Sequence, residues 1–241
     1  MNPPGILAPA PDARPWSDDP YAEAMRTGSG PLWLRRADGH RHPLDVERWC
    51  APPDSADWTL LSRCLRRGLP TLDIGCGPGR LVAALQTCGL PALGVDITHT
   101  AVARTRGLGG NALCRSVFDP LPGERRWGSA LLADGNLGIG GDPSALLRRA
   151  AQLLAHDGLL LVEVEPGDLD ERVTVTVEDG SGRNGPAFPW ARLGAPAALR
   201  CADEAGFALA DAWTSQERHF LALRRRTGHR GSHRTEVVRA R

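Results

Sequence analysis

The fold is decided by the stretch LDIGCGPGR (residues 72–80), which is followed directly by LVAAL (residues 81–85). An apolar strand runs into three glycines at alternate positions, and a helix begins at once. Because glycine has no Cβ, the backbone can turn tightly there and approach a ligand closely. The free N–H groups at the start of the helix favour a carboxylate or a phosphate. We therefore expect a ligand-binding strand–turn–helix unit; a tight turn without a ligand is the alternative.

After Pro70, short apolar runs alternate with helical stretches. The predicted strands are 71–74, 92–95, 112–118, 129–133, 159–164, 207–213 and 219–223. The predicted helices are 80–87, 101–106, 144–155 and 195–205. Strands separated by single helices indicate crossover connections, which give a parallel sheet. The expected fold class is α/β, a doubly wound, Rossmann-like and mostly parallel sheet of seven strands with helices on both faces.

The chain divides into four expected segments. Residues 1–20 hold six prolines and form a flexible arm, and residues 21–69 form a small N-terminal cap segment with a hairpin around Asp38-Gly39. Residues 70–223 form the α/β domain. Within it, a β-rich run at 173–177 precedes a Gly/Pro-rich loop, 179–190, read as a lid anchored by Phe188 and Trp190. Residues 224–241 form a basic tail with seven arginines and one glutamate, for which solvation is favoured over contact with nucleic acid.

Composition excludes several classes of protein. Among 241 residues, 29 basic side chains, all arginine, face 28 acidic ones, so the formal net charge is +1, which argues against a dedicated nucleic-acid binder. No apolar run approaches the ~20 residues of a membrane span. The N-terminus lacks the features of a secretory signal, and the six cysteines form no CxxC pair, so we expect a cytoplasmic protein with reduced thiols and without a metal.

A carboxylate marks the end of the second strand. Asp96 lies 21 residues after Gly75, where a carboxylate beside the glycine loop can accept both hydroxyls of a ribose. Alone, Asp96 would more often be a helix cap or a solvated turn residue. Dinucleotide binding favours G-x-G-x-x-G, and Arg80 occupies the position of its third glycine. This substitution weakens the interpretation as a dinucleotide-binding protein and leaves it as an alternative.

Residues 71–80, together with Asp96, Asp119 and the order of the strands, resemble the class I S-adenosylmethionine-dependent methyltransferase family over about residues 70–223. The resemblance implies an antiparallel last strand and S-adenosylmethionine as the cofactor. It places Asp73 and Gly75 beside the methionine part, and Cys76, Gly77 and Gly79 in the loop under it. It further places Asp96 on the ribose hydroxyls, Ile97, Val117 and Phe118 against the adenine, Asp119 beside its amino group, and Asp134 and Asn136 facing methionine and substrate.

The resulting hypothesis is a methyltransferase that transfers a methyl group to an O, N or C acceptor on a small or medium-sized molecule. A nicotinamide-dependent oxidoreductase and a non-catalytic S-adenosylmethionine-binding protein are the alternatives. DNA base methylation is disfavoured. Family members that methylate exocyclic amines of bases carry a polar residue, two prolines and an aromatic residue after the fourth strand, and those that methylate pyrimidine C5 use a Pro-Cys nucleophile. This chain has neither pattern. We expect a small-molecule partner, no nucleic acid and no membrane, and leave a homodimer open.

No catalytic residue is assigned from the sequence. None of the polar candidates Asp134, Asn136, His40, His42, His99 and His219 is named as catalytic. A capping role at a helix start is favoured for His99, and a solvated turn for His40 and His42. Aromatic residues of the cap segment also have two interpretations. In one interpretation Tyr21, Trp33, Trp49 and Arg48 line a substrate chamber. In the other, Trp33, Trp49 and Trp58 form the core of a small appendage.

Overall fold

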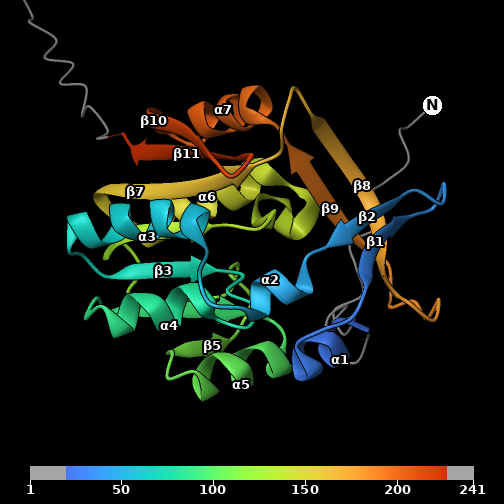
Figure 1. Cartoon of the computed structure of the whole chain (residues 1–241). Coiled ribbons are helices and arrows are strands. Elements are labelled where there is room, and N and C mark those ends of the chain that lie inside the picture. The colour runs from blue at the N-terminus through green and yellow to red at the C-terminus, as the bar shows by residue number, and fades with distance from the viewer. Residues whose placement is uncertain (1–19, 227–241) are drawn as a thin grey trace, which may run out of the picture.

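The computed structural model describes residues 20–226 and contains two β-sheets (Figure 1). Apart from Pro20 and residues 224–226, the predicted arm (1–20) and basic tail (224–241) lie outside the described residues. Residues 224 and 225, the first two of the predicted tail, belong to the last strand.

The larger sheet has seven strands in the order β10-β11-β7-β6-β3-β4-β5. Their bounds are β3 (Thr71–Ile74), β4 (Ala92–Asp96), β5 (Ala112–Cys114), β6 (Trp127–Leu132), β7 (Leu154–Val164), β10 (Phe207–Ser215) and β11 (Arg218–Arg225). Strands β3 to β7 pair in parallel, whereas β11 is antiparallel to both of its neighbours. The expected sheet with its antiparallel last strand is confirmed. A dinucleotide-binding sheet of six parallel strands has no such strand between its fifth and sixth positions.

Helices cover both faces of this sheet, as expected. Helices α3 (Ser55–Arg67), α4 (Arg80–Thr87) and α5 (His99–Gly107) pack on one face, and α6 (Pro143–Leu153) and α7 (Ala195–Glu204) on the other. Alternation along β6 explains the two layers, because successive side chains of a strand point to opposite faces. Leu131 lies in the cluster with α3 and α4, while Ala130 and Leu132 lie in the cluster with α6 and α7.

The smaller sheet joins segments that are distant in sequence. It consists of β1 (Leu32–Arg36), β2 (Arg41–Leu44), β8 (Asp170–Asp179) and β9 (Phe188–Leu193), all antiparallel, in the order β2-β1-β8-β9. Helices α1 (Pro20–Thr27) and α2 (Val46–Cys50) share its apolar core. We call these four strands and two helices the cap. In Figure 1 the cap stands at the side toward which β3 points, beyond the carboxyl ends of the parallel strands.

Two sequence expectations are corrected by the fold. The strand predicted at 112–118 ends at Cys114, because Ser116 forms a turn: its carbonyl accepts a hydrogen bond from Asp119 N (3.1 Å) and its hydroxyl from Phe118 N (3.2 Å). The loop read as a lid contains strand β9, which pairs with β8. The cap therefore combines residues of the segments 21–69 and 70–223, and the boundary between those segments stays a prediction.

The short 3₁₀ helix η1 (Asn136–Gly141) follows β6 and carries the glycine-rich run seen in the sequence. A Cβ on Gly138 would lie 2.2 Å from the carbonyl oxygen of Ala191, and one on Gly141 would lie 2.6 Å from Cβ of Pro189. Since both neighbours belong to β9, these two glycines allow the cap strand to pack against the turn after β6. Packing, and not only ligand approach, explains their presence.

Substitution of Gly79 by alanine should destabilise the protein more than the same change at Gly89. Both glycines have positive φ (87° and 79°), which costs alanine about 1–2 kcal/mol. A Cβ on Gly79 would also lie 2.4 Å from Thr105, whereas nothing lies within 4 Å of one on Gly89. We expect this overpacking to cost about 1–3 kcal/mol more in Gly79→Ala, measured by urea unfolding. Equal losses in the two variants would contradict the packing.

Candidate functional site

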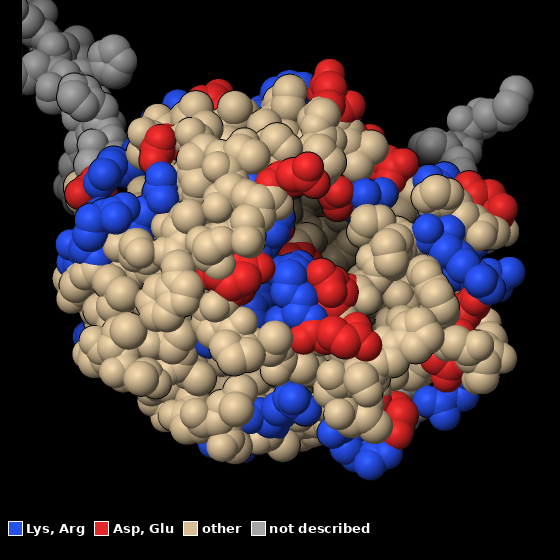
Figure 2. Space-filling view, viewed as in Figure 1, with Lys and Arg blue, Asp and Glu red and all other residues tan. Residues whose placement is uncertain are grey.

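A pocket of about 460 Å³ lies between the carboxyl ends of the parallel strands and the cap, within the size range of small-ligand sites. Figure 2 shows the face of the molecule that is hollowed, with arginine and carboxylate side chains gathered beside the hollow. The pocket is lined by most of the predicted site residues, namely Gly75, Cys76, Gly77, Asp96, Ile97, Val117, Phe118, Asp134 and Asn136. Asp73, Gly79 and Asp119 are not among its lining residues.

The three glycines of the loop between β3 and α4 all have positive φ (71°, 52° and 87°). A Cβ would have a different neighbour at each of the three positions. A Cβ on Gly75 would lie 2.8 Å from Nδ2 of Asn136, and Gly79 faces Thr105. At Gly77, by contrast, the nearest atom to a Cβ within 4 Å is the Tyr21 hydroxyl, at 3.6 Å. The space over Gly77 is therefore open to the pocket, as a ligand lying on the loop requires.

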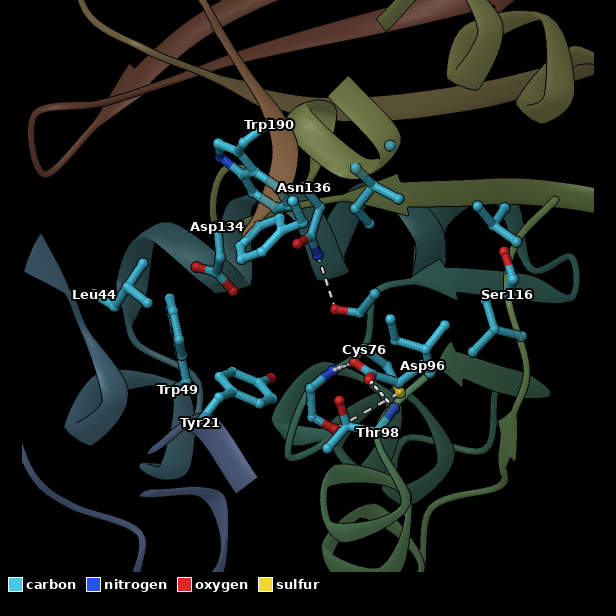
Figure 3. Close-up of a pocket in the computed structure, with 18 of the residues that line it drawn as sticks. Tyr21, Leu44, Trp49, Cys76, Asp96, Thr98, Ser116, Asp134, Asn136 and Trp190 are labelled. Atoms are coloured by element: carbon cyan, nitrogen blue, oxygen red, sulfur yellow. Dashed lines mark hydrogen bonds between the residues drawn. The ribbon is translucent and has the colours of Figure 1, made fainter. Parts of the chain in front are cut away.

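Asp96 is held at the end of β4 by two backbone donors (Figure 3). Its Oδ2 accepts a hydrogen bond from Gly77 N (2.9 Å), and its Oδ1 accepts one from Thr98 N (2.8 Å). Burial raises the pKa of Asp96, and these backbone hydrogen bonds oppose that rise. The Asp96 side chain is only partly buried and lines the pocket beside Gly77. Two adjacent hydroxyl groups of a ligand could donate to its carboxylate there.

Cys76 and Asn136 fix the loop on its two sides. The Cys76 thiol packs against β4, where a Cβ on Gly94 would lie 2.5 Å from the sulfur. Burial raises the pKa of this thiol well above its usual value, so it is not a thiolate nucleophile. From η1, the Asn136 side-chain amide donates to the carbonyls of Ile74 (3.0 Å) and Gly75 (2.8 Å). Both residues therefore shape the loop.

A buried ion network forms one wall of the pocket. Arg80, the first residue of α4, is only 6% exposed. Its guanidinium donates twice to Asp57 of α3, at 2.8 Å for both bonds, and also donates to Asp134 at 2.7 and 3.1 Å. Bidentate pairs of this kind fix the orientation of both partners. The residue that weakened the dinucleotide interpretation thus anchors the loop to α3 and to the end of β6.

Further arginines extend the network. Arg218 of β11 binds Glu163 of β7 through two bonds of 2.8 Å, and Arg48 of α2 donates to Asp134 at 2.7 Å. Burial alone would raise the pKa of Asp134, but the charges of Arg80 and Arg48 hold it well below the usual range. Asp134 therefore stays an ion-paired anion at neutral pH and is not available as a general base.

The three predicted site residues outside the pocket lining have different surroundings. Gly79 allows the loop to pack closely against Thr105 of α5, because a Cβ at this position would collide with that side chain. Asp73 is buried in β3, and burial raises its pKa to about 7. Asp119 is exposed in the turn after β5, where its carbonyl accepts a hydrogen bond from Arg149 at 2.7 Å. Cofactor contacts of all three stay predictions.

Sequence reasoning named the aromatic residues that the cap contributes to the pocket and missed the aliphatic ones. The cap supplies Tyr21, Leu34, Leu44, Trp49, Phe188, Pro189 and Trp190 to the pocket, and Ala187 lines it from the loop just before β9. Tyr21 and Trp49 were expected as candidates, whereas Trp33 and Arg48 do not line the pocket. Alternation along β1 separates Trp33 from Leu34, which faces the pocket. Phe188 and Trp190 were expected as anchors of a lid, and the structure places both on strand β9, where they line the pocket.

A sequence model of the methyltransferase domain matches residues 50–209 of this chain. The chain belongs to the methyltransferase domain family. The matched region spans α3, the glycine loop, Asp96 and most of the seven-stranded sheet, and it includes β8 and β9 of the cap. The family resemblance stated from residues 71–80 is thereby confirmed.

Solved structures share the fold of this methyltransferase. An S-adenosylmethionine-dependent methyltransferase from Bacteroides fragilis, in complex with S-adenosylhomocysteine, superposes with a TM-score of 0.69 at 18% identity, covering 84% of this chain and 91% of that chain. A 1,6-didemethyltoxoflavin-N1-methyltransferase from Burkholderia thailandensis gives 0.54 at 20% identity, covering 71% and 77%. The sugar N-methyltransferase KedS8 from a Streptoalloteichus species gives 0.55 at 17%, covering 72% and 88%.

A search of curated protein sequences finds no match to this methyltransferase. Within residues 20–226, no helix is both long enough and apolar enough to cross a membrane.

The buried carboxyl of Asp73 should make stability fall as pH rises from about 4 to about 7. The folded protein keeps this proton up to a pKa of about 7, whereas the unfolded chain loses it near 4, so rising pH favours unfolding in that window. The full effect is roughly 4 kcal/mol. Asp73→Asn removes this titration, so the variant should gain stability relative to the native protein between about pH 5 and about pH 8. Urea unfolding at both pH values measures the difference, and parallel pH profiles would contradict it.

Proposed function

We propose that this methyltransferase uses S-adenosylmethionine to methylate an O, N or C atom of a small or medium-sized molecule. The observation that carries the proposal is the pocket at Gly77 and Asp96. The loop is open above Gly77, and the Asp96 carboxylate faces the pocket beside it. Similar structures that contain S-adenosylhomocysteine support the choice of cofactor.

The residues that would hold the cofactor fall into two groups. Asp96 would bind the ribose hydroxyls, and Ile97, Val117 and Phe118 would lie against the adenine. The methionine part would lie over Gly75 and Gly77, beside Asn136. When bound, the cofactor supplies an electrophilic methyl group on a sulfonium centre. The chain's own residues would bind and orient both partners.

The polar residues of the pocket favour catalysis by alignment. No histidine is among the described residues that line it, and Asp134 is paired with arginines. Alignment of two reactants contributes much of the rate in reactions of this kind, whereas a base is needed only for an acceptor that arrives protonated. Methyl transfer by positioning alone fits this site.

The remaining expectations are also proposals. A small-molecule acceptor is supported by the cap over the pocket and by similar structures that carry the names of a sugar and a toxoflavin methyltransferase. A cytoplasmic location is supported by the six cysteines, all within the described residues, which are free thiols. The antiparallel β11 and Arg80 count against the nicotinamide alternative.

S-adenosylhomocysteine should bind the native protein in calorimetry, and Asp96→Asn should weaken that binding by about 10–100-fold. Hydrogen bonds to a charged group contribute about 1.5–3 kcal/mol, and 1.4 kcal/mol is tenfold. Asp211→Asn is the matched control, since Asp211 of β10 pairs with Arg63 outside the pocket lining and should retain binding. Absence of binding to the native protein, or equal affinity in Asp96→Asn, would refute the proposal. Methyl transfer from labelled cofactor to extract molecules then separates an enzyme from a binding protein.

A further inference from the structure

The part of the pocket enclosed by the cap has aromatic walls on two sides. Tyr21 of α1 and Trp49 of α2 form one pair, with ring centroids 6.5 Å apart, and Phe188 and Trp190 of β9 form another, 6.1 Å apart and edge to face. In Figure 3, Trp190 lies on one side of the space and Tyr21 with Trp49 on the other, while Leu44 lies beyond them. We call this space the cap chamber.

The cap chamber begins directly at the glycine loop. The Tyr21 hydroxyl is the nearest atom to a Cβ placed on Gly77 within 4 Å. Ile139 of η1 lines the pocket beside Gly75, and Leu34 and Leu44 of the cap add to its apolar lining. A molecule in the chamber would therefore lie next to a cofactor bound over Gly77.

The charges at the chamber are already paired. Arg80 and Asp134, the charged lining residues on this side, bind each other, and Asp57 and Arg48 complete their ion pairs. Arg115, a further charged lining residue, lies after β5 near the Asp96 end of the pocket, where it donates to the Pro120 carbonyl at 2.8 Å. A charged molecule in the chamber would lose water without gaining a free counter-charge, which is unfavourable.

From these observations, and resting on the proposed function, we infer that the methyl acceptor is a flat, uncharged aromatic or conjugated molecule that binds between the Tyr21–Trp49 pair and the Phe188–Trp190 pair. Aromatic side chains on two sides recognise the faces and edges of a planar ring beyond simple apolar burial. Phe188 and Trp190 would then be residues that determine acceptor specificity.

The test uses the full chain saturated with S-adenosylhomocysteine and four probes built on the same fused two-ring system, titrated by calorimetry at neutral pH. Naphthol is flat and neutral, its fully hydrogenated alcohol is neutral but not flat, naphthoate is an anion, and naphthylmethylamine is a cation. We expect naphthol to bind at least about tenfold more tightly than each of the others. Equal or tighter binding of the saturated alcohol, the anion or the cation would overturn the inference.

Variants of Trp190 and Trp33 test whether naphthol binds in the cap chamber. Trp190→Ala should weaken naphthol binding about tenfold, and Trp190→Phe, which keeps a ring, should restore most of it. Trp33→Ala is the matched control, because Trp33 lies on the same sheet outside the pocket lining, with Arg41 over its ring. It should leave naphthol binding unchanged, and equal losses in Trp33→Ala and Trp190→Ala would contradict the chamber.

Affinity for S-adenosylhomocysteine, measured in every variant, separates the two proposals. Absence of S-adenosylhomocysteine binding to the native protein refutes the proposed function. Retained cofactor binding without preference for naphthol refutes only the inference about the acceptor.

Discussion

The arrangement of the site depends on the guanidinium of Arg80 and its two carboxylate partners. Arg80 is the first residue of α4 and directly follows the glycine loop, so a fixed Arg80 fixes the position of that loop. Asp57 holds it from α3, and Asp134 holds it from the end of β6. Removal of one partner from such a buried pair typically costs about 3–5 kcal/mol, because an uncompensated charge remains. The network therefore imposes one geometry on the loop.

The same network connects the cap to the seven-stranded sheet. Arg48 reaches Asp134 from α2, and the backbone N–H of Asp134 donates to Glu163 of β7 at 2.7 Å. Asp134 has a positive φ of 56°, unusual for a residue with a side chain, and its contacts account for that conformation. Because Asp134 is paired with Arg48 and Arg80, it does not act as a proton acceptor. It orients the pocket while aromatic residues of the cap shape its other side.

Local sequence patterns predicted the seven-stranded sheet and the centre of the pocket. The alternation of strands and helices after Pro70 gave the crossover topology, and Gly77 and Asp96 meet as their spacing indicated. Both are short-range features: the glycine loop joins neighbouring elements, and Asp96 ends the adjacent parallel strand. Arg80 illustrates the limit of this reasoning, because the sequence revealed only the missing glycine and not the partners of the guanidinium.

The cap could not be predicted because its pairing is distant in sequence. Leu34 of β1 lies opposite Val177 of β8, 143 positions later, and no local pattern encodes such a partner. The same applies to Phe188 and Trp190, which the glycine-rich composition of residues 179–190 placed in a loop. The strand predicted at 112–118 shows the opposite error: it extended too far, since hydrogen bonds at Ser116 end the strand early.

The central claim is that the cofactor lies over Gly77 with its reactive sulfur toward the cap. The most direct measurement is a crystal structure of the full chain with S-adenosylhomocysteine bound. The account predicts both ribose hydroxyls within hydrogen-bond distance of the Asp96 carboxylate, and the sulfur facing the space between Trp49 and Trp190. A ribose placed away from Asp96, or a sulfur directed away from that space, would contradict it.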